Sequence, residues 1–197
     1  WQGYQQSTYY SYVIDPLDDL KAVYQNISSN YRNNKIKKAQ QQVSVNHDGS
    51  LEDFYRVIKM SFERQGLTYP FSFDYFQNYD AALNAQHARQ LFFAVDEQQN
   101  IHSVAYLIWD QRAAYYHLTG DDPNLRNSGA GILLIWEAIQ YTQKKLGLST
   151  FDFEGSMISS IEKVRRELGA KAWPYSNIRK YNSKIFQLLH LLKSWRK

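Results

Sequence analysis

Three apolar runs follow one another near the middle of the chain, and they constrain its fold more than any other feature. They cover 91–95, 101–109 and 113–118, with only short polar turns between them. Connections this short join antiparallel neighbours. The sequence therefore predicts a three-stranded meander. Its middle strand is apolar almost throughout from Val104 to Trp109, so it should be covered on both faces.

Amphipathic helices are expected around this meander. Ser50, followed by Asp53 three residues later, predicts a helix start, and apolar residues then recur on one face as far as Phe62. A shorter helix should follow and end near His87. Gly129 should begin a long helix that runs to residue 146, with its own buried stripe.

Further elements are expected towards both ends of the chain. Before the meander these are a strand over 9–14, a helix begun by Pro16 or Leu17, a polar and basic stretch over 28–42 and a short strand around 43–45. After the long helix they are a strand over 150–153, a helix capped by Ser156 and ended by Gly169, a strand over 172–178 and a closing helix around 185–192.

This order of elements predicts a mixed α/β fold, with a central, mostly antiparallel sheet and helices on both faces. Hydrophobic residues make up 44% of the chain and aromatic residues 16%, which is ample for a packed core. A length of 197 residues suits one large domain better than two small ones. We therefore expect a single domain over 1–197, with a lead-in over 1–45 and the core over 46–197.

Composition also excludes several kinds of site. The chain has no cysteine, which excludes disulfides, thiolate metal sites and a cysteine nucleophile. Its five histidines are scattered without ligand spacing, so we expect no metal site. No apolar stretch approaches the roughly 20 residues of a membrane span, which favours a soluble protein. Because the lack of cysteine gives no support for an oxidising compartment, we expect a cytoplasmic location. Because the first residue is Trp1 and not methionine, we expect that an upstream segment is missing.

The excess of positive charge is modest and mostly lies in two clusters. The net charge is +4, and the clusters are Arg32, Lys35, Lys37 and Lys38, and then Lys193, Arg196 and Lys197. Clusters of this size are more typical of a solvated helix face than of a polyanion site.

A glycine-rich loop at Arg126, Gly129, Ala130 and Gly131 lies between a predicted strand and the long helix. Glycines let a ligand approach the backbone, and the first amides of a helix attract an anion such as a pyrophosphate. The spacing R-x-x-G-x-G resembles the acyl-coenzyme A loop of GNAT enzymes. The alternative is a tight turn with no ligand. The loop lacks the Gly-Lys-Ser/Thr ending of a P-loop, and it lacks the third glycine of a dinucleotide-binding fingerprint.

Two carboxylates follow one strand later. Alternation along the strand places Phe151 and Phe153 on one face and Asp152 and Glu154 on the other. Carboxylates at a strand end can act as a general base or bind an amine. The alternative is that they are solvent-facing charges or partners of the next helix start.

Taken in order, these segments resemble the carboxyl-terminal half of Fem-like proteins of the GNAT superfamily. The resemblance rests on the runs 115–120, 129–136, 151–156 and 168–170, and on the earlier basic segment with Tyr31, Arg32 and 36–39. It covers most of the chain. It implies a GNAT-like fold and a preceding lobe that this chain lacks.

The resemblance also implies an activity. Fem ligases of the cell wall transfer amino acids from aminoacyl-tRNA to a peptidoglycan precursor, so we expect acyl or aminoacyl transfer to an amine of a cell-envelope precursor or related metabolite. Asp152 or Glu154 would be the base, and Tyr116 or the backbone beside it would be an oxyanion donor. The Arg126 loop would bind the donor, acetyl-coenzyme A or aminoacyl-tRNA, neither of them a permanently bound cofactor. The acceptor would contact His117, Lys163 and Arg166.

Two other functions stay open at this point. One is a coenzyme A-dependent N-acetyltransferase of small molecules. The other is a catalytically silent lobe that binds a substrate or partner and supports a missing domain. The sequence leaves the identity of donor and acceptor, and the oligomeric state, undetermined.

Overall fold

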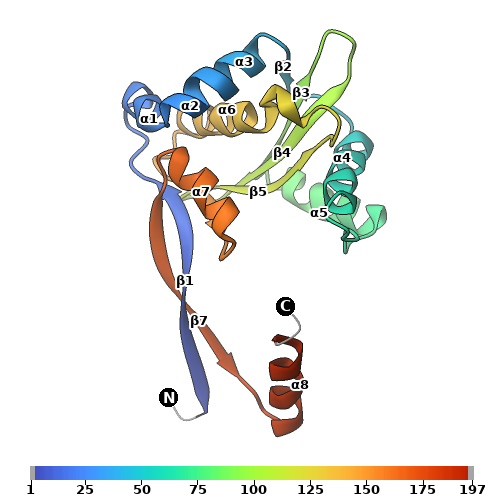
Figure 1. Ribbon diagram of the computed structural model, residues 1–197, viewed down its shortest axis with the longest axis vertical. Coiled ribbons are helices and arrows are strands. Elements are labelled where there is room, and N and C mark those ends of the chain that lie inside the picture. The colour runs from blue at the N-terminus through green and yellow to red at the C-terminus, as the bar shows by residue number, and fades with distance from the viewer. Residues whose placement is uncertain (1–2, 195–197) are drawn as a thin grey trace.

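The computed structural model describes residues 3–194 and contains one seven-stranded sheet (Figure 1). Its strands, in the spatial order β2-β3-β4-β5-β6-β1-β7, are β1 (Tyr4–Ile14), β2 (Ser44–Asn46), β3 (Arg89–Val95), β4 (Ile101–Trp109), β5 (Ala114–Asp121), β6 (Phe151–Gly155) and β7 (Lys171–Lys180). Every neighbouring pair is antiparallel except β5 and β6, which are parallel. The predicted mixed, mostly antiparallel sheet and its central meander are confirmed.

Helices cover both faces of this sheet, and each face has its own core. On one face lie α1 (Leu20–Asn26), α2 (Ser29–Tyr31), the π-helical turn η1 (Arg32–Ile36), α3 (Lys37–Gln40) and α6 (Ala130–Lys144), the last preceded by a 3₁₀ turn, η2 (Arg126–Ser128). On the other lie α4 (Leu51–Glu63) and α5 (Phe73–Ala85). β4 contributes to both cores, Leu107 to one and Tyr106 to the other, so the cover predicted for this strand is confirmed.

Two of the four predicted helix starts, at Ser50 and Gly129, agree with the structure, and two do not. Ser50 caps α4 as expected, accepting a hydrogen bond from the amide of Asp53 at 3.0 Å. The first helix begins only at Leu20, because Asp19 is the residue whose carboxylate caps it. α7 (Ser159–Glu167) starts after Ile158, and Ser156 instead accepts the amide of Ile158 in the preceding turn. The stretch 28–42, which had no predicted structure, is mostly helical.

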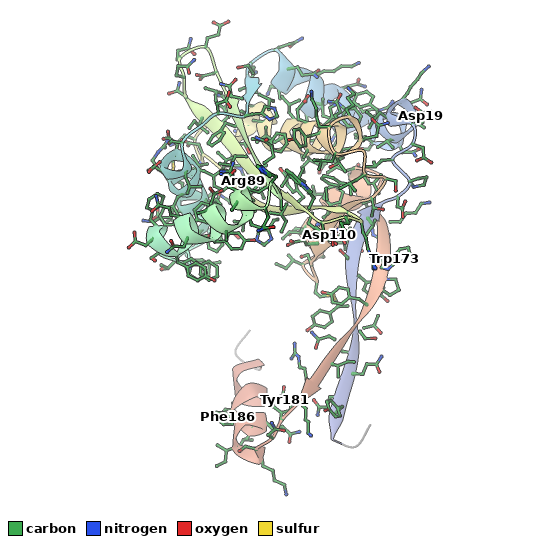
Figure 2. All side chains as sticks on the ribbon, turned by 180° about the vertical axis from the view of Figure 1, so that it is seen from behind. Asp19, Arg89, Asp110, Trp173, Tyr181 and Phe186 are labelled. Atoms are coloured by element: carbon green, nitrogen blue, oxygen red, sulfur yellow. The ribbon has the colours of Figure 1, made fainter. Side chains whose placement is uncertain are left out.

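An arm made of β1 and β7 extends away from the rest of the molecule (Figure 1). β1 pairs with β6 only from Ser11 to Ile14, whereas it pairs with β7 from Tyr4 to Val13. The closing helix α8 (Lys184–Ser194) lies at the far end, and Figure 2 shows Phe186 on it. Exposed apolar side chains occupy the arm and helix, namely Tyr4, Tyr10, Trp173, Tyr175, Ile178, Ile185, Phe186, Leu188, Leu189 and Leu192. Between residues 3 and 194, no helix is long and apolar enough to cross a membrane.

The turn between β3 and β4 carries a carboxylate whose titration should affect stability. Asp96 accepts hydrogen bonds from the amide of Asn100 at 2.8 Å and from its side chain at 3.0 Å, and His102 Nε2 lies 3.1 Å away. These bonds, led by that of the Asn100 side chain, lower the pKa of Asp96 to about 2.

A folded-state pKa below the unfolded value stabilises the protein above the unfolded pKa. We expect the Asp96 contribution to be present at neutral pH and to be lost as the pH falls from about 4 towards 2. Urea unfolding of the wild type and of Asp96→Asn should therefore differ at neutral pH and converge in acid. A stability difference that stays constant over this range would contradict the assignment.

Candidate functional site

The site is built where two parallel strands separate. β5 and β6 pair only at Ala114 with Phe151 and at Tyr115 with Asp152. Beyond these pairs β5 continues along β4, and β6 continues along β1. At their carboxyl ends, β5 is therefore paired only with β4 and β6 only with β1. The position of the side chains on each of these strands then depends on a different neighbouring strand.

A β-bulge in β5 sets the position of His117. Tyr106 of β4 pairs with Leu118 and Leu107 pairs with Tyr116, so His117 is the extra residue opposite no partner. A bulge reverses the alternation of side chains along its strand. Accordingly Tyr116 packs in the core beneath α6, whereas Leu118 packs in the core beneath α4 and α5.

A second irregularity, in β6, sets the position of Glu154. Val13 of β1 pairs with Asp152 and Ser11 pairs with Gly155, so two residues of β6 lie opposite Tyr12 alone. Glu154 has φ +60°, in the left-handed region that a residue with a side chain rarely adopts. Strain of this kind persists only where the surroundings fix it, and it gathers at functional sites.

The surroundings that fix Glu154 are three hydrogen bonds. Its amide donates to Asp152 Oδ1 at 2.7 Å, and the Ser11 hydroxyl donates to the same carboxylate oxygen. Its carbonyl accepts from Arg165 Nη1 of α7 at 2.7 Å. Asp152 and Arg165 therefore hold the backbone on both sides of the Glu154 side chain.

The two bulges bring His117 and Glu154 together. His117 Nδ1 lies 2.8 Å from Glu154 Oε1, and the side chains are 28% and 38% exposed, so the pair is accessible from solvent. On its other side, His117 Nε2 lies 3.1 Å from the hydroxyl of Tyr79 on α5. Burial, and then the charge of Glu154, raise the pKa of Tyr79.

A buried ion pair anchors α5 beside this group. Asp80, next to Tyr79, binds Arg89 of β3 at 2.9 Å and accepts a hydrogen bond from the Tyr106 hydroxyl at 2.8 Å. Figure 2 shows Arg89 between α5 and the sheet. The centre of the Tyr106 ring also lies 6.4 Å from that of the His117 ring. The buried Tyr106 side chain therefore contacts both Asp80 and His117.

A family model for the acetyltransferase (GNAT) domain matches residues 28–159, which is most of the chain. The chain belongs to this GNAT family. A search of curated proteins finds no match. Among solved structures, FemX aligns with a TM-score of 0.76 at 14% identity, over 95% of this chain and 65% of that one.

Two lysylphosphatidylglycerol synthetase structures align over a similar extent. The carboxyl-terminal domain of the putative synthetase from Agrobacterium fabrum gives a TM-score of 0.65 at 12% identity, over 98% of this chain and 65% of that one. L-PGS from Bacillus licheniformis gives 0.65 at 13% identity, over 96% and 66%. Identities this low establish the shared fold alone. The predicted resemblance to Fem-like GNAT proteins is confirmed, and this GNAT domain spans about two thirds of each protein it matches.

The structure brings together some of the predicted catalytic residues of this GNAT domain. Glu154 lies within hydrogen-bond distance of His117, and the Asp152 carboxylate accepts a hydrogen bond from the backbone amide of Glu154. Tyr116, predicted as an oxyanion donor, lies on the opposite face of β5 from His117 and packs on Phe151 and Phe153. Its hydroxyl is buried without a hydrogen-bond partner in the part of the chain that the structure describes, and burial raises its pKa.

The predicted donor loop is covered by other parts of this GNAT domain. Gly129 has φ +84°, and a Cβ built there would lie 2.8 Å from the carbonyl oxygen of Lys35. A Cβ at Gly131 would lie 2.9 Å from Asp121 Oδ1. Ala130 is buried, whereas Arg126 is exposed. The start of α6 therefore already faces a carboxylate and a carbonyl of its own chain, which repel an anion.

The contact at Gly129 leads to a stability prediction. Gly129→Ala should destabilise the domain by roughly 2–3 kcal/mol, because two costs add together. Alanine would have to adopt a left-handed backbone conformation, and its Cβ would overlap with the backbone of Lys35. Gly147→Ala is the matched control: its φ is +66°, but no atom lies within 4 Å of its Cβ, so only about 1 kcal/mol should be lost. Equal losses in denaturant titrations would mean that the start of α6 is open.

The predicted acceptor residues lie in two places. His117 belongs to the group with Glu154, whereas Lys163 and Arg166 line a shallow groove between α7 and the turn around Asn26 and Ser28. Arg166 there binds Glu162 at 2.8 Å. Sequence reasoning missed Tyr79 and Arg165, since nothing in the spacing of either residue distinguishes it from an ordinary helix side chain.

Proposed function

We propose that this domain transfers an acyl or aminoacyl group to a primary amine, and that the His117–Glu154 pair takes up the proton of that amine. The observation that carries the proposal is the convergence of two β-bulges on one hydrogen-bonded and partly exposed pair. Bulges next to active sites re-aim side chains, and the strained Glu154 backbone has no evident role in packing.

The chemistry of amide formation fits the groups at this site. An amine must lose a proton as it attacks an acyl carbon, and a carboxylate paired with an imidazole can receive that proton. The bulge leaves His117 without a partner residue on β4, and we propose its amide as a donor to the developing oxyanion. Asp152 and Arg165 act by holding Glu154 in place.

An aminoacyl donor is favoured over acetyl-coenzyme A. The pyrophosphate of coenzyme A would have to displace the Asp121 carboxylate and the Lys35 carbonyl from the start of α6. FemX and lysylphosphatidylglycerol synthetase, the latter named for a lysyl product, share the fold. We therefore propose aminoacyl-tRNA as donor, a cytoplasmic location where it is available, and an amine of a cell-envelope precursor as acceptor.

A partner lobe is the second part of this proposal. The chain spans under two thirds of FemX, and its arm leaves large apolar side chains exposed along β1, β7 and α8. Isolated two-stranded ribbons and short lone helices are marginal in water. We propose that the arm packs against a further lobe and that the chain contributes one domain to the active protein.

The test is a transfer assay with the full chain, joined to any further lobe that its gene encodes. Charged bulk tRNA and a nucleotide-linked peptidoglycan peptide serve as substrates, and the aminoacylated peptide is detected by mass. We expect product with the wild type and with Glu63→Gln, an exposed control on α4, and none with Glu154→Gln.

Two other outcomes would replace the proposal. A rise in melting temperature with acetyl-coenzyme A, followed by acetyl transfer to small amines, would support the coenzyme A-dependent enzyme, since a ligand that binds the folded state raises its stability. Transfer that is unchanged in Glu154→Gln would move the chemistry to the further lobe and leave this domain as its silent support.

A further inference from the structure

Both ring nitrogens of His117 are engaged within the protein. Nδ1 lies 2.8 Å from Glu154 Oε1, and Nε2 lies 3.1 Å from the Tyr79 hydroxyl. Three side chains from α5, β5 and β6 thus form one continuous hydrogen-bonded series. Neither nitrogen of His117 is free to meet a substrate directly while this series is intact.

The chemistry of the two ends fixes the direction of these hydrogen bonds. An ionised Glu154 only accepts, so the proton of a neutral imidazole lies on Nδ1. Nε2 then carries the lone pair and accepts the proton of the Tyr79 hydroxyl. This is the order of groups, carboxylate, imidazole and hydroxyl, that lets a hydroxyl exchange protons reversibly in hydrolases.

We propose that the Tyr79 hydroxyl is the catalytic group that exchanges a proton with the substrates, and that His117 and Glu154 act behind it as a relay. This inference rests on the proposed amine acylation and assigns the atom that performs its proton transfers. Tyr79 is only partly buried, and its hydroxyl lies 3.1 Å from His117 Nε2.

The proton balance closes over one turnover. As the amine nitrogen bonds to the acyl carbon, its proton passes to Tyr79 Oη and the Tyr79 proton passes to Nε2, so that His117 becomes an imidazolium stabilised by the Glu154 carboxylate. When the bond between the acyl carbon and the ester oxygen of the donor breaks, the two transfers reverse and the proton leaves on that oxygen. The products are an amide and an alcohol, and the relay returns to its starting state.

Two further features support this role for Tyr79. Burial and the nearby Glu154 carboxylate raise the pKa of Tyr79, so the hydroxyl keeps its proton until a substrate is bound. The adjacent Asp80 is fixed by Arg89 and Tyr106, which holds this turn of α5 against the sheet. A relay needs such fixed distances, because proton transfer falls off steeply once hydrogen bonds lengthen.

Tyr79→Phe tests the inference, because it removes the hydroxyl and keeps the ring. With an aminoacyl ester as donor, namely charged tRNA, we expect kcat/KM to fall on the order of 10²–10⁴-fold. With a thioester of the same amino acid the loss should be at least about ten-fold smaller, because a thiolate leaves without being protonated. Tyr75→Phe, one helical turn earlier and exposed, is the matched control and should keep full activity with both donors.

A second variant separates proton relay from mere positioning. In His117→Gln the side-chain amide can accept from Tyr79 and donate to Glu154, but it cannot pass a proton between them. We expect the same loss as in Tyr79→Phe, with melting temperature retained. Full activity of His117→Gln, or equal losses of Tyr79→Phe with ester and thioester, would overturn the relay.

The failure of the relay and the failure of the proposed function are distinguishable. If Glu154→Gln is inactive while Tyr79→Phe is fully active, amine acylation at this site stands and Glu154 meets the amine itself. If Glu154→Gln is fully active, the site is not catalytic and the relay falls with it.

Discussion

Replacing Glu154 with alanine or with glycine is expected to abolish transfer to a similar extent, while the glycine variant is the more stable of the two. Both substitutions remove the carboxylate that orients His117 and stabilises its protonated form, so kcat/KM should fall on the order of 10²–10⁴-fold in each. Only glycine adopts φ +60° without cost, and it should exceed alanine by about 1 kcal/mol in the free energy of unfolding.

The comparison between two substitutions isolates the backbone. Each variant loses the same hydrogen bond to His117, so the lost contact cancels from their difference. Asp152 is the matched control position, since it lies in the same strand and has no positive φ. There alanine should be the more stable, by roughly 0.5–1 kcal/mol. Denaturant titrations that rank alanine above glycine at both positions would remove the argument that Glu154 is held under strain.

The sequence predicted well whatever depends on local pattern. The meander followed from three apolar runs and short turns, and the cap of α4 followed from Ser50 and Asp53. The two faces of β6 followed from simple alternation: Phe151 and Phe153 are buried, and Asp152 and Glu154 are not. Glu154 could be named as a candidate base because a carboxylate at a strand end is visible without tertiary contacts.

The sequence could not predict what depends on register. His117 reaches Glu154 because one extra residue in β5 turns its side chain, and no glycine or proline marks that bulge. Tyr79 comes from a helix 38 residues earlier in the chain. The cover over Gly129 is supplied by Lys35, from a segment whose polar composition gave no basis for placing it. Each of these contacts exists only once distant elements have packed.

Asp80→Ala should be the most destabilising single substitution among those considered, with a loss of roughly 3–5 kcal/mol. The carboxylate is 10% exposed and binds Arg89, which is 21% exposed, and it accepts the Tyr106 hydroxyl. Removing it leaves a buried guanidinium and a buried hydroxyl without their partner. Desolvation of those two groups is then uncompensated.

Comparison with an exposed ion pair separates the effect of burial on stability from the effect of charge. Asp53 binds Arg56 at 3.0 Å with side chains 46% and 53% exposed, so Asp53→Asn should cost under about 1 kcal/mol for its ion pair. The loss of stability in Asp80→Asn should lie between those of Asp53→Asn and Asp80→Ala. An amide oxygen can still accept the hydrogen bond of the Tyr106 hydroxyl, but Arg89 loses its ion-pair partner. A joint Asp80→Leu and Arg89→Met replacement should recover much of the loss of Asp80→Ala, because neither charge is then buried alone.

The same variants test whether the ion pair positions the site. Tyr79 lies on α5, and α5 is held to the sheet at Asp80. If the joint replacement restores stability but not transfer, the ion pair sets the distance between Tyr79 and His117 as well as the stability of the fold. Recovery of both would show that packing alone places α5, and then the buried charges serve stability only.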